Sequence, residues 1–144
     1  MIARTLLLAA TLAAAPLAAT TAMADEGLTP SKPGTKVYII SPEDGATVSS
    51  PVTVLFGTSG MGIAPAGVDV EGTGHHHLLV NRDLPDLTSA VPASEQSIHY
   101  GGGQTESVLE LEPGTYSLQL LFADHRHIPH DPPIYSERIT ITVE

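Results

Sequence analysis

The sequence predicts an all-β domain in which two antiparallel sheets pack face to face. No segment after residue 24 shows the 3.6-residue apolar period of a helix. Seven short runs are instead rich in β-branched and aromatic residues, and Gly and Pro separate them. In two of these runs, residues 115–122 and 139–143, apolar side chains alternate with polar ones, which is typical of strands with one buried face.

The first 24 residues have the pattern of an export signal. Arg4 supplies the positive charge, residues 6–17 form the apolar segment, and Ala22-Met23-Ala24 is a small-x-small cleavage site. The mature chain should therefore begin at Asp25. The apolar segment is too short and too rich in alanine to span a membrane, and no later segment approaches a span. We expect an exported protein that resides in the periplasm or, alternatively, is fully secreted.

Composition limits the classes of partner. Without the signal, 120 of the 144 residues remain, and because only Arg4 among the six basic residues is lost, the formal charge changes from −10 to −11. So acidic a surface repels nucleic acid and anionic lipid and attracts cations. The chain has no cysteine, which excludes disulfides, thiolate zinc sites and cysteine-ligated blue copper.

The mature chain divides into a flexible lead-in and one domain. Residues 25–35 are rich in Pro, Gly, Ser and Thr and predict the flexible lead-in, and residues 36–144 form the domain. The predicted strands, in order, are residues 36–40, 52–56, 76–81, 98–100, 106–111, 115–122 and 135–143. Residues 57–74 and 82–96 form the longest predicted loops between them.

The number, length and spacing of the strands favour an immunoglobulin-like sandwich. Glu112-Pro113-Gly114 forms a tight turn, and Tyr116 follows it near the start of the penultimate strand, at the position of a tyrosine corner. In this fold the third strand, 76–81, lies antiparallel to the penultimate strand, 115–122, and the last strand lies on its other side.

Six of the seven histidines fall in two segments, 74–80 and 123–133. The first segment contains His75, His76 and His77, and the second contains His125, His127 and His130. The first segment begins one strand and the second follows the end of its antiparallel neighbour. The topology therefore predicts that the two segments meet at one end of the sandwich.

Side-chain parity indicates which imidazoles can share an ion. If Leu78 and Val80 point into the core, His75 and His77 point outward together and His76 points toward the core. His125 and His127 form a second outward pair if the chain stays extended beyond residue 122. These four, with His130 as a fifth, are the predicted metal ligands, and imidazole nitrogen suits copper(II) and zinc.

Three further residues are candidates for supporting roles. Asp124 could fix the tautomer of a ligating imidazole, or it could be an ordinary loop carboxylate. Asp131, which precedes two prolines, could support the site or turn the chain. His99 could support the site or be a histidine on an edge strand.

Three functions remain open at this point. The first is non-enzymatic binding of copper or zinc by an exported domain. The second is an envelope interaction or adhesion module in which the histidine cluster is structural. The third is a metal-dependent enzyme, which is disfavoured because no carboxylate occupies an obvious general-base position and no Gly-x-Ser-x-Gly motif is present.

Several motifs together resemble a family of small exported bacterial proteins, catalogued as domain of unknown function 4399 (DUF4399). The motifs lie at residues 40–46, 60–67, 74–79, 103–106 and 124–133. The resemblance covers nearly the whole mature chain and implies an exported domain, without a settled activity. In plan the chain is also similar to periplasmic copper-carrier sandwiches, by analogy of fold only, and their methionine-rich copper(I) motif is absent here.

Overall fold

The computed structural model describes residues 27–144. This part of the chain contains ten strands, connected by turns and loops, and no helix. The predicted export signal lies outside these residues. The all-β prediction is confirmed, and within residues 27–144 there is no helix long and apolar enough to cross a membrane.

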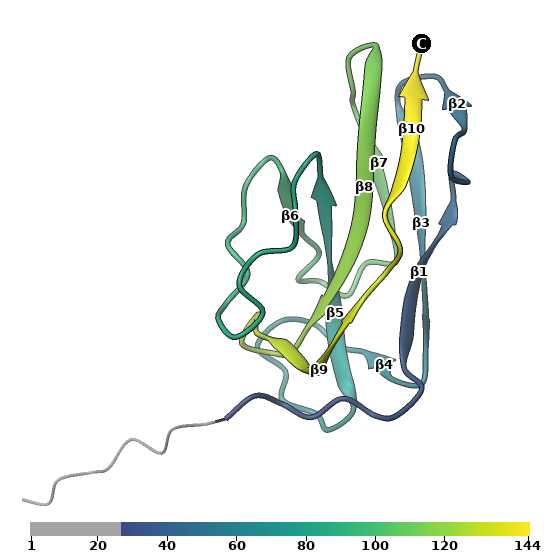
Figure 1. Cartoon of the computed structure of the whole chain (residues 1–144). Helices are drawn as coiled ribbons and strands as arrows, with labels where there is room; N and C mark the ends of the chain where they lie inside the picture. Colours follow the sequence, from purple (N-terminus) through teal and green to yellow (C-terminus); the bar gives the residue numbers. More distant parts are fainter. Residues whose placement is uncertain (1–26) are drawn as a thin grey trace, which may run out of the picture.

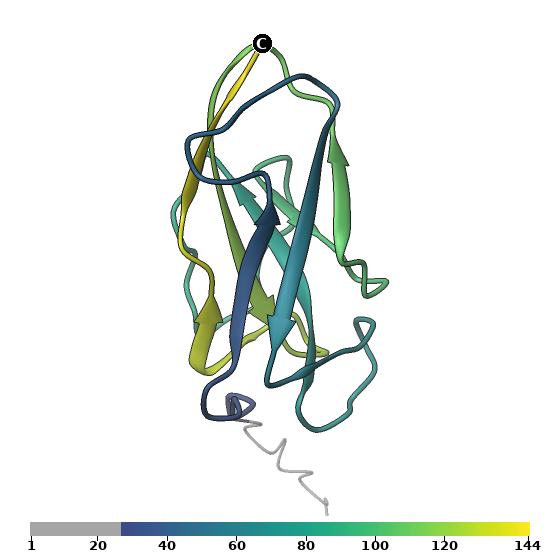
Figure 2. The same ribbon diagram turned by 90° about the vertical axis from the view of Figure 1, so that its right-hand side faces the viewer.

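The strands form two sheets that face each other (Figures 1 and 2). The three-stranded sheet has the antiparallel order β1 (Lys36–Ser41), β3 (Val52–Ser59) and β7 (Glu106–Leu109). The larger sheet has the order β2 (Thr47–Val48), β10 (Ile139–Val143), β8 (Gly114–Ala123), β5 (Thr73–Val80) and β4 (Gly62–Ile63). Two further strands complete the larger sheet: β6 (Ser97–His99) pairs with β5, and β9 (Pro129–Tyr135) pairs with β8.

The main core lies between the sheets and takes alternate residues from each strand. Its largest fully buried members are Leu78 of β5, Leu118, Leu120 and Phe122 of β8, and Ile141 of β10. Because side chains alternate along a strand, the residues between these point to the outer face of the larger sheet. The prediction that alternate apolar residues of segment 115–122 form one buried face is therefore confirmed.

The predicted neighbours of the penultimate strand are also confirmed. β5 and β8 are antiparallel, with His75 opposite Ala123 and Val80 opposite Leu118, and β10 pairs with the other side of β8 (Figure 1). The hydroxyl of Tyr116 donates a hydrogen bond to the carbonyl of Glu112 at 2.9 Å, as a tyrosine corner requires.

The last predicted strand, 135–143, is in fact two strands. β9 and β10 lie one after the other along the same side of β8, and residues 136–138 interrupt them. At the break, the hydroxyl of Ser136 accepts a hydrogen bond from the amide of Leu120, in place of a backbone partner. β9 thus brings residues 129–135, which were expected to be mostly loop, into the sheet beside the end of β8.

A second apolar cluster covers the outer face of the larger sheet. Leu79 of β5 and Leu121 of β8 are fully buried there by Val91, with Leu84 and Leu87 packed around them. The segment 82–96, which the sequence predicts as a loop, therefore makes a cover for this face. Leu79 is consequently buried, although it points away from the main core.

The segment before β1 lies against β9. The amide of Asp131 donates to the carbonyl of Thr29, and the amide of Ser31 donates to the carbonyl of Asp131, both at 2.9 Å. Residues 29–31 of the expected flexible lead-in thus carry hydrogen bonds to the sheet.

Candidate metal centre

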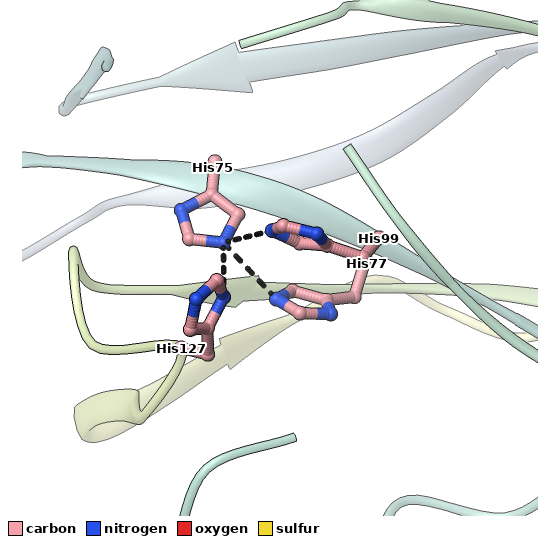
Figure 3. Close-up of side chains that lie close together, drawn as sticks. All are labelled: His75, His77, His99 and His127. Carbon is pink, nitrogen blue, oxygen red and sulfur yellow. Dashed lines mark hydrogen bonds between the residues drawn. The ribbon is translucent and has the colours of Figure 1, made fainter. Parts of the chain in front are cut away.

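Four imidazoles meet at the end of the outer face where β5 begins and β8 ends (Figure 3). They belong to His75, His77, His99 and His127, and we call them the four-histidine cluster. Each ring offers one nitrogen to a possible ion, and these four nitrogens all lie within 4.8 Å of one another. Nε2 of His75 is the centre of the group, at 3.2 Å from Nε2 of His77, 3.2 Å from Nε2 of His99 and 3.3 Å from Nδ1 of His127.

Three of the four histidines are positioned by strand register. His75 and His77 are separated by two residues on β5 and therefore point to the same face. His99 of β6 lies directly opposite His77 in the antiparallel ladder, so its side chain points to that face as well. Ile98 beside it packs against the main core.

The fourth histidine is positioned by a tight turn. β8 ends at Ala123, and the chain reverses within four residues, with the amide of Asp124 donating to the carbonyl of Ile128 and the amide of His127 donating to the carbonyl of Asp124. His127 has φ of 67°, in the left-handed region that non-glycine residues rarely adopt. Its carbonyl accepts a hydrogen bond from the amide of Val91 in the covering segment, which fixes it from the other side.

The carboxylate of Asp124 holds this turn together. It is 1% exposed and accepts hydrogen bonds from the amides of Arg126 and Ile128, from the hydroxyl of Thr29 at 2.6 Å, and from the guanidinium of Arg126 at 3.0 Å. Burial alone would raise the pKa of Asp124, but the hydrogen bonds from Thr29, Ile128 and Arg126 outweigh it and hold the pKa below its usual value. Asp124 therefore stays ionised and acts on the cluster through the backbone that carries His127.

The environment favours the neutral form of three of the four imidazoles, those of His75, His77 and His99. His75 and His77 are 0% and 1% exposed. Burial, reinforced by the neighbouring imidazoles, lowers the pKa of His75 to about 4 and that of His77 to about 3, and it also lowers the pKa of His99. Neutral imidazole is the form that binds a metal ion.

Hydrogen bonding cannot account for the arrangement. Nε2 of a neutral imidazole either donates one hydrogen bond or accepts one. Nε2 of His75 nevertheless has three ring nitrogens at 3.2 to 3.3 Å, so at most one of these contacts can be a hydrogen bond in any one state. The Nδ1 atoms of His75 and His77 have no hydrogen-bond partner among residues 27–144, so the polar contacts of both rings are all made inside the cluster.

Two histidines predicted to be ligands do not join the cluster. The expectation that His125 and His127 share a face is wrong, because the chain turns at Asp124 and does not remain extended. His125 instead places Nδ1 at 3.4 Å from the carboxylate of the exposed Asp69. His130 is buried on β9, stacks on Phe122 and donates from Nε2 to the carbonyl of Thr73 at 3.2 Å.

Two other residues considered in the sequence analysis, His76 and Asp131, also lie outside the four-histidine cluster. His76 points toward the core, as expected, where its ring packs between Phe56 and Phe122 and Nε2 lies 2.9 Å from the hydroxyl of Thr58. Burial lowers its pKa to about 4. Asp131 is exposed and takes part through its backbone, which pairs with Thr29 and Ser31.

His99 is the cluster member that the sequence underrated, as a supporting residue. A signal was available, because the short run 97–99 has an apolar residue at its centre. Once Ile98 is directed into the core, the alternation of a strand directs Ser97 and His99 to the outer face. The missing information was that this strand pairs with β5 rather than with another edge.

Comparison with known proteins identifies the family. The model of the domain of unknown function DUF4399 matches residues 54–144, which include all four cluster histidines. Comparisons with curated proteins and with solved structures find no match. The predicted resemblance is confirmed over this range, and the chain belongs to the DUF4399 family.

Proposed function

We propose that this protein binds a transition-metal cation, copper or zinc, in the four-histidine cluster and that it does so without catalysing a reaction. Imidazole nitrogen is a preferred ligand of both ions, and four nitrogens from one protein chain make a complete set for a four-coordinate site. A catalytic site of this kind normally has three protein ligands and keeps the fourth position open for water or substrate.

The observation that carries the proposal is the convergence of three ring nitrogens on Nε2 of His75 at 3.2 to 3.3 Å. Four ligands at about 2.0 to 2.1 Å from a central ion lie about 3.3 Å from one another in a tetrahedron. The separations around His75 therefore match those of nitrogens that share one ion. Hydrogen bonding between neutral imidazoles would account for at most one of these three contacts at a time.

Two properties of the chain support this function. The excess of acidic residues attracts cations toward the surface. The predicted export signal would deliver the protein to the periplasm or beyond, and we propose the periplasm as its place of action.

Metal analysis of protein purified without a polyhistidine tag tests the proposal. We expect one equivalent of copper or zinc per chain after reconstitution and dialysis. His77→Ala/His127→Asn removes one buried and one turn ligand, and Asn is chosen because it tolerates the left-handed backbone at 127. This variant should lose the metal.

His125→Ala is the matched control, because it removes a histidine of the same segment whose ring lies outside the cluster. It should retain one equivalent. Equal metal content in the double variant and the wild type would overturn the proposal, and it would leave the cluster with a structural role.

A further inference from the structure

The shape of the four-histidine cluster distinguishes between the two candidate metals. In a square-planar site each nitrogen has two neighbours at about 2.8 Å and one opposite partner at about 4.0 Å, for metal–nitrogen bonds of about 2.0 Å. In a tetrahedral site each nitrogen has three neighbours at about 3.3 Å. Nε2 of His75 has three neighbours at 3.2, 3.2 and 3.3 Å, and none of the three is an opposite partner.

The rings of the cluster lie at different angles to one another: the ring of His77 is turned by 39° from that of His75 and by 35° from that of His99, and the other pairs are steeper. The ring of His127 is turned by 81° from that of His75 and by 73° from that of His99, and the ring of His75 is turned by 74° from that of His99. Figure 3 shows His77, His99 and His127 approaching one nitrogen of His75 from different directions. The other pairs of ligand atoms lie within 4.8 Å, so those that exceed about 3.3 Å would shorten when an ion binds.

The side chains available around the cluster disfavour three other metal ions, copper(I), iron(II) and manganese(II). Copper(I) also accepts four ligands, but it is selected by soft sulfur. The chain has no cysteine, and Met61, the methionine within the described residues, is buried in the main core. Iron(II) and manganese(II) sites use carboxylates. The buried carboxylate of Asp124 is committed to Thr29, Arg126 and Ile128.

We propose that the cluster is a tetrahedral zinc(II) site that does not support the tetragonal geometry of copper(II). The inference rests on the proposed function, since it assigns the ion that the same four residues hold. Copper(II) exceeds zinc(II) in raw affinity for nitrogen ligands. A site that imposes a tetrahedron reduces this difference in affinity. Copper(II) binds less well there because it prefers a tetragonal geometry, whereas zinc(II) has no geometric preference from its d-electrons.

Cobalt(II) is a spectroscopic substitute for zinc(II) and gives the direct test. A tetrahedral cobalt(II) complex absorbs visible light far more strongly than an octahedral one. We expect one equivalent of cobalt(II), added to the tag-free metal-free protein, to give an intense visible spectrum that one equivalent of zinc(II) abolishes. His99→Ala should alter the spectrum and weaken binding, and His125→Ala should leave both unchanged.

Electron paramagnetic resonance of the copper(II)-loaded protein completes the test. A copper(II) spectrum distorted toward a tetrahedron, together with intense cobalt(II) absorption, supports the assignment. Weak cobalt(II) absorption and a tetragonal copper(II) spectrum that the cluster variants abolish would overturn the assignment to zinc and leave the metal-binding function standing. Absence of binding by all three ions would overturn both.

Discussion

Gly101 lies against the imidazole ring of His99. A Cβ at position 101 would overlap Cε1 of that ring and lie 2.6 Å from its Nε2, the atom that approaches His75. No side chain other than hydrogen fits at 101 while His99 occupies the cluster. Gly101 is therefore a positioning residue for the four-histidine cluster, and it acts through the ring of His99.

We predict that Gly101→Ala weakens metal binding without unfolding the protein. The added methyl group displaces the ring of His99, which sits at the free end of a side chain and can rotate away from the cluster. Loss of one ligand position should lower the affinity for zinc(II) by about 10- to 100-fold, the range found when support for a ligand is removed. Competition with a chromophoric chelator measures the change.

Gly102→Ala is the control for this variant. The atoms nearest to a Cβ there belong to the end of the side chain of Gln104, the first at 3.1 Å, and this flexible side chain can move aside. Zinc affinity should stay at the wild-type value. An equal loss in the two variants would show that the glycine run matters for its flexibility rather than for the space beside His99.

Asp124→Asn should destabilise the fold and weaken metal binding together. The amide would place an N–H group where Oδ1 or Oδ2 now accepts hydrogen bonds, and Arg126 would lose its buried counter-charge. Loss of one partner from a buried charged network costs about 2 to 4 kcal/mol in the free energy of unfolding. Chemical denaturation of the metal-free protein measures the stability, and a zinc titration measures the effect on His127.

Asp131→Asn is the matched control, because Asp131 is an exposed carboxylate in the same segment. Its substitution should change the free energy of unfolding by no more than about 0.5 kcal/mol. If Asp124→Asn lowered stability but left zinc affinity unchanged, the turn would not be what positions His127.

The strand pairing on which the cluster depends could be predicted because it follows from local pattern. The alternation of residues 116–122 fixes which face of β8 is buried, and Leu78 and Val80 fix the same for β5. With the two strands antiparallel neighbours, the opposite directions of His76 and of His75 and His77 follow from a period of two.

The turn that carries His127 could not be predicted in the same way. Its geometry depends on Asp124, whose partners include Thr29, 95 residues away in the sequence. Nor does any local pattern show that segment 82–96 folds over the outer face and fixes the carbonyl of His127 through Val91. Contacts of such long sequence separation are set by the whole fold, and they decide that His127 enters the cluster and His125 does not.

The middle histidine of the 75–77 run should be dispensable for metal binding. His76 faces the core, so His76→Leu/Thr58→Val replaces a hydrogen-bonded pair, fully buried at His76 and half-buried at Thr58, by apolar side chains of similar size. Replacing both partners of such a pair can be nearly neutral, and we expect a change of at most about 1 kcal/mol in the free energy of unfolding. The cobalt(II) spectrum should be unchanged, and its loss in a folded double variant would contradict the outward and inward assignment on β5.

The stability of the metal-free protein should fall as the pH is lowered from about 6.5 to 4. Burial lowers the pKa of His75 and His76 to about 4 and that of His77 to about 3, from an ordinary value of 6.5. Between these values the unfolded chain binds protons that the folded chain does not, so protonation favours unfolding. Each such histidine contributes a slope of at most about 1.4 kcal/mol per pH unit, and the slope levels off below the folded pKa values.

Urea denaturation of the metal-free protein at several pH values measures this slope. His76→Leu/Thr58→Val should reduce it by the share of one histidine, because His76 then no longer titrates in either state. Saturating zinc(II) should raise stability near pH 7, and this gain should vanish on acidification, because protons compete with the metal for the same nitrogens. A stability that stayed constant from pH 7 to 4 in the metal-free protein would contradict the burial of neutral imidazoles on β5.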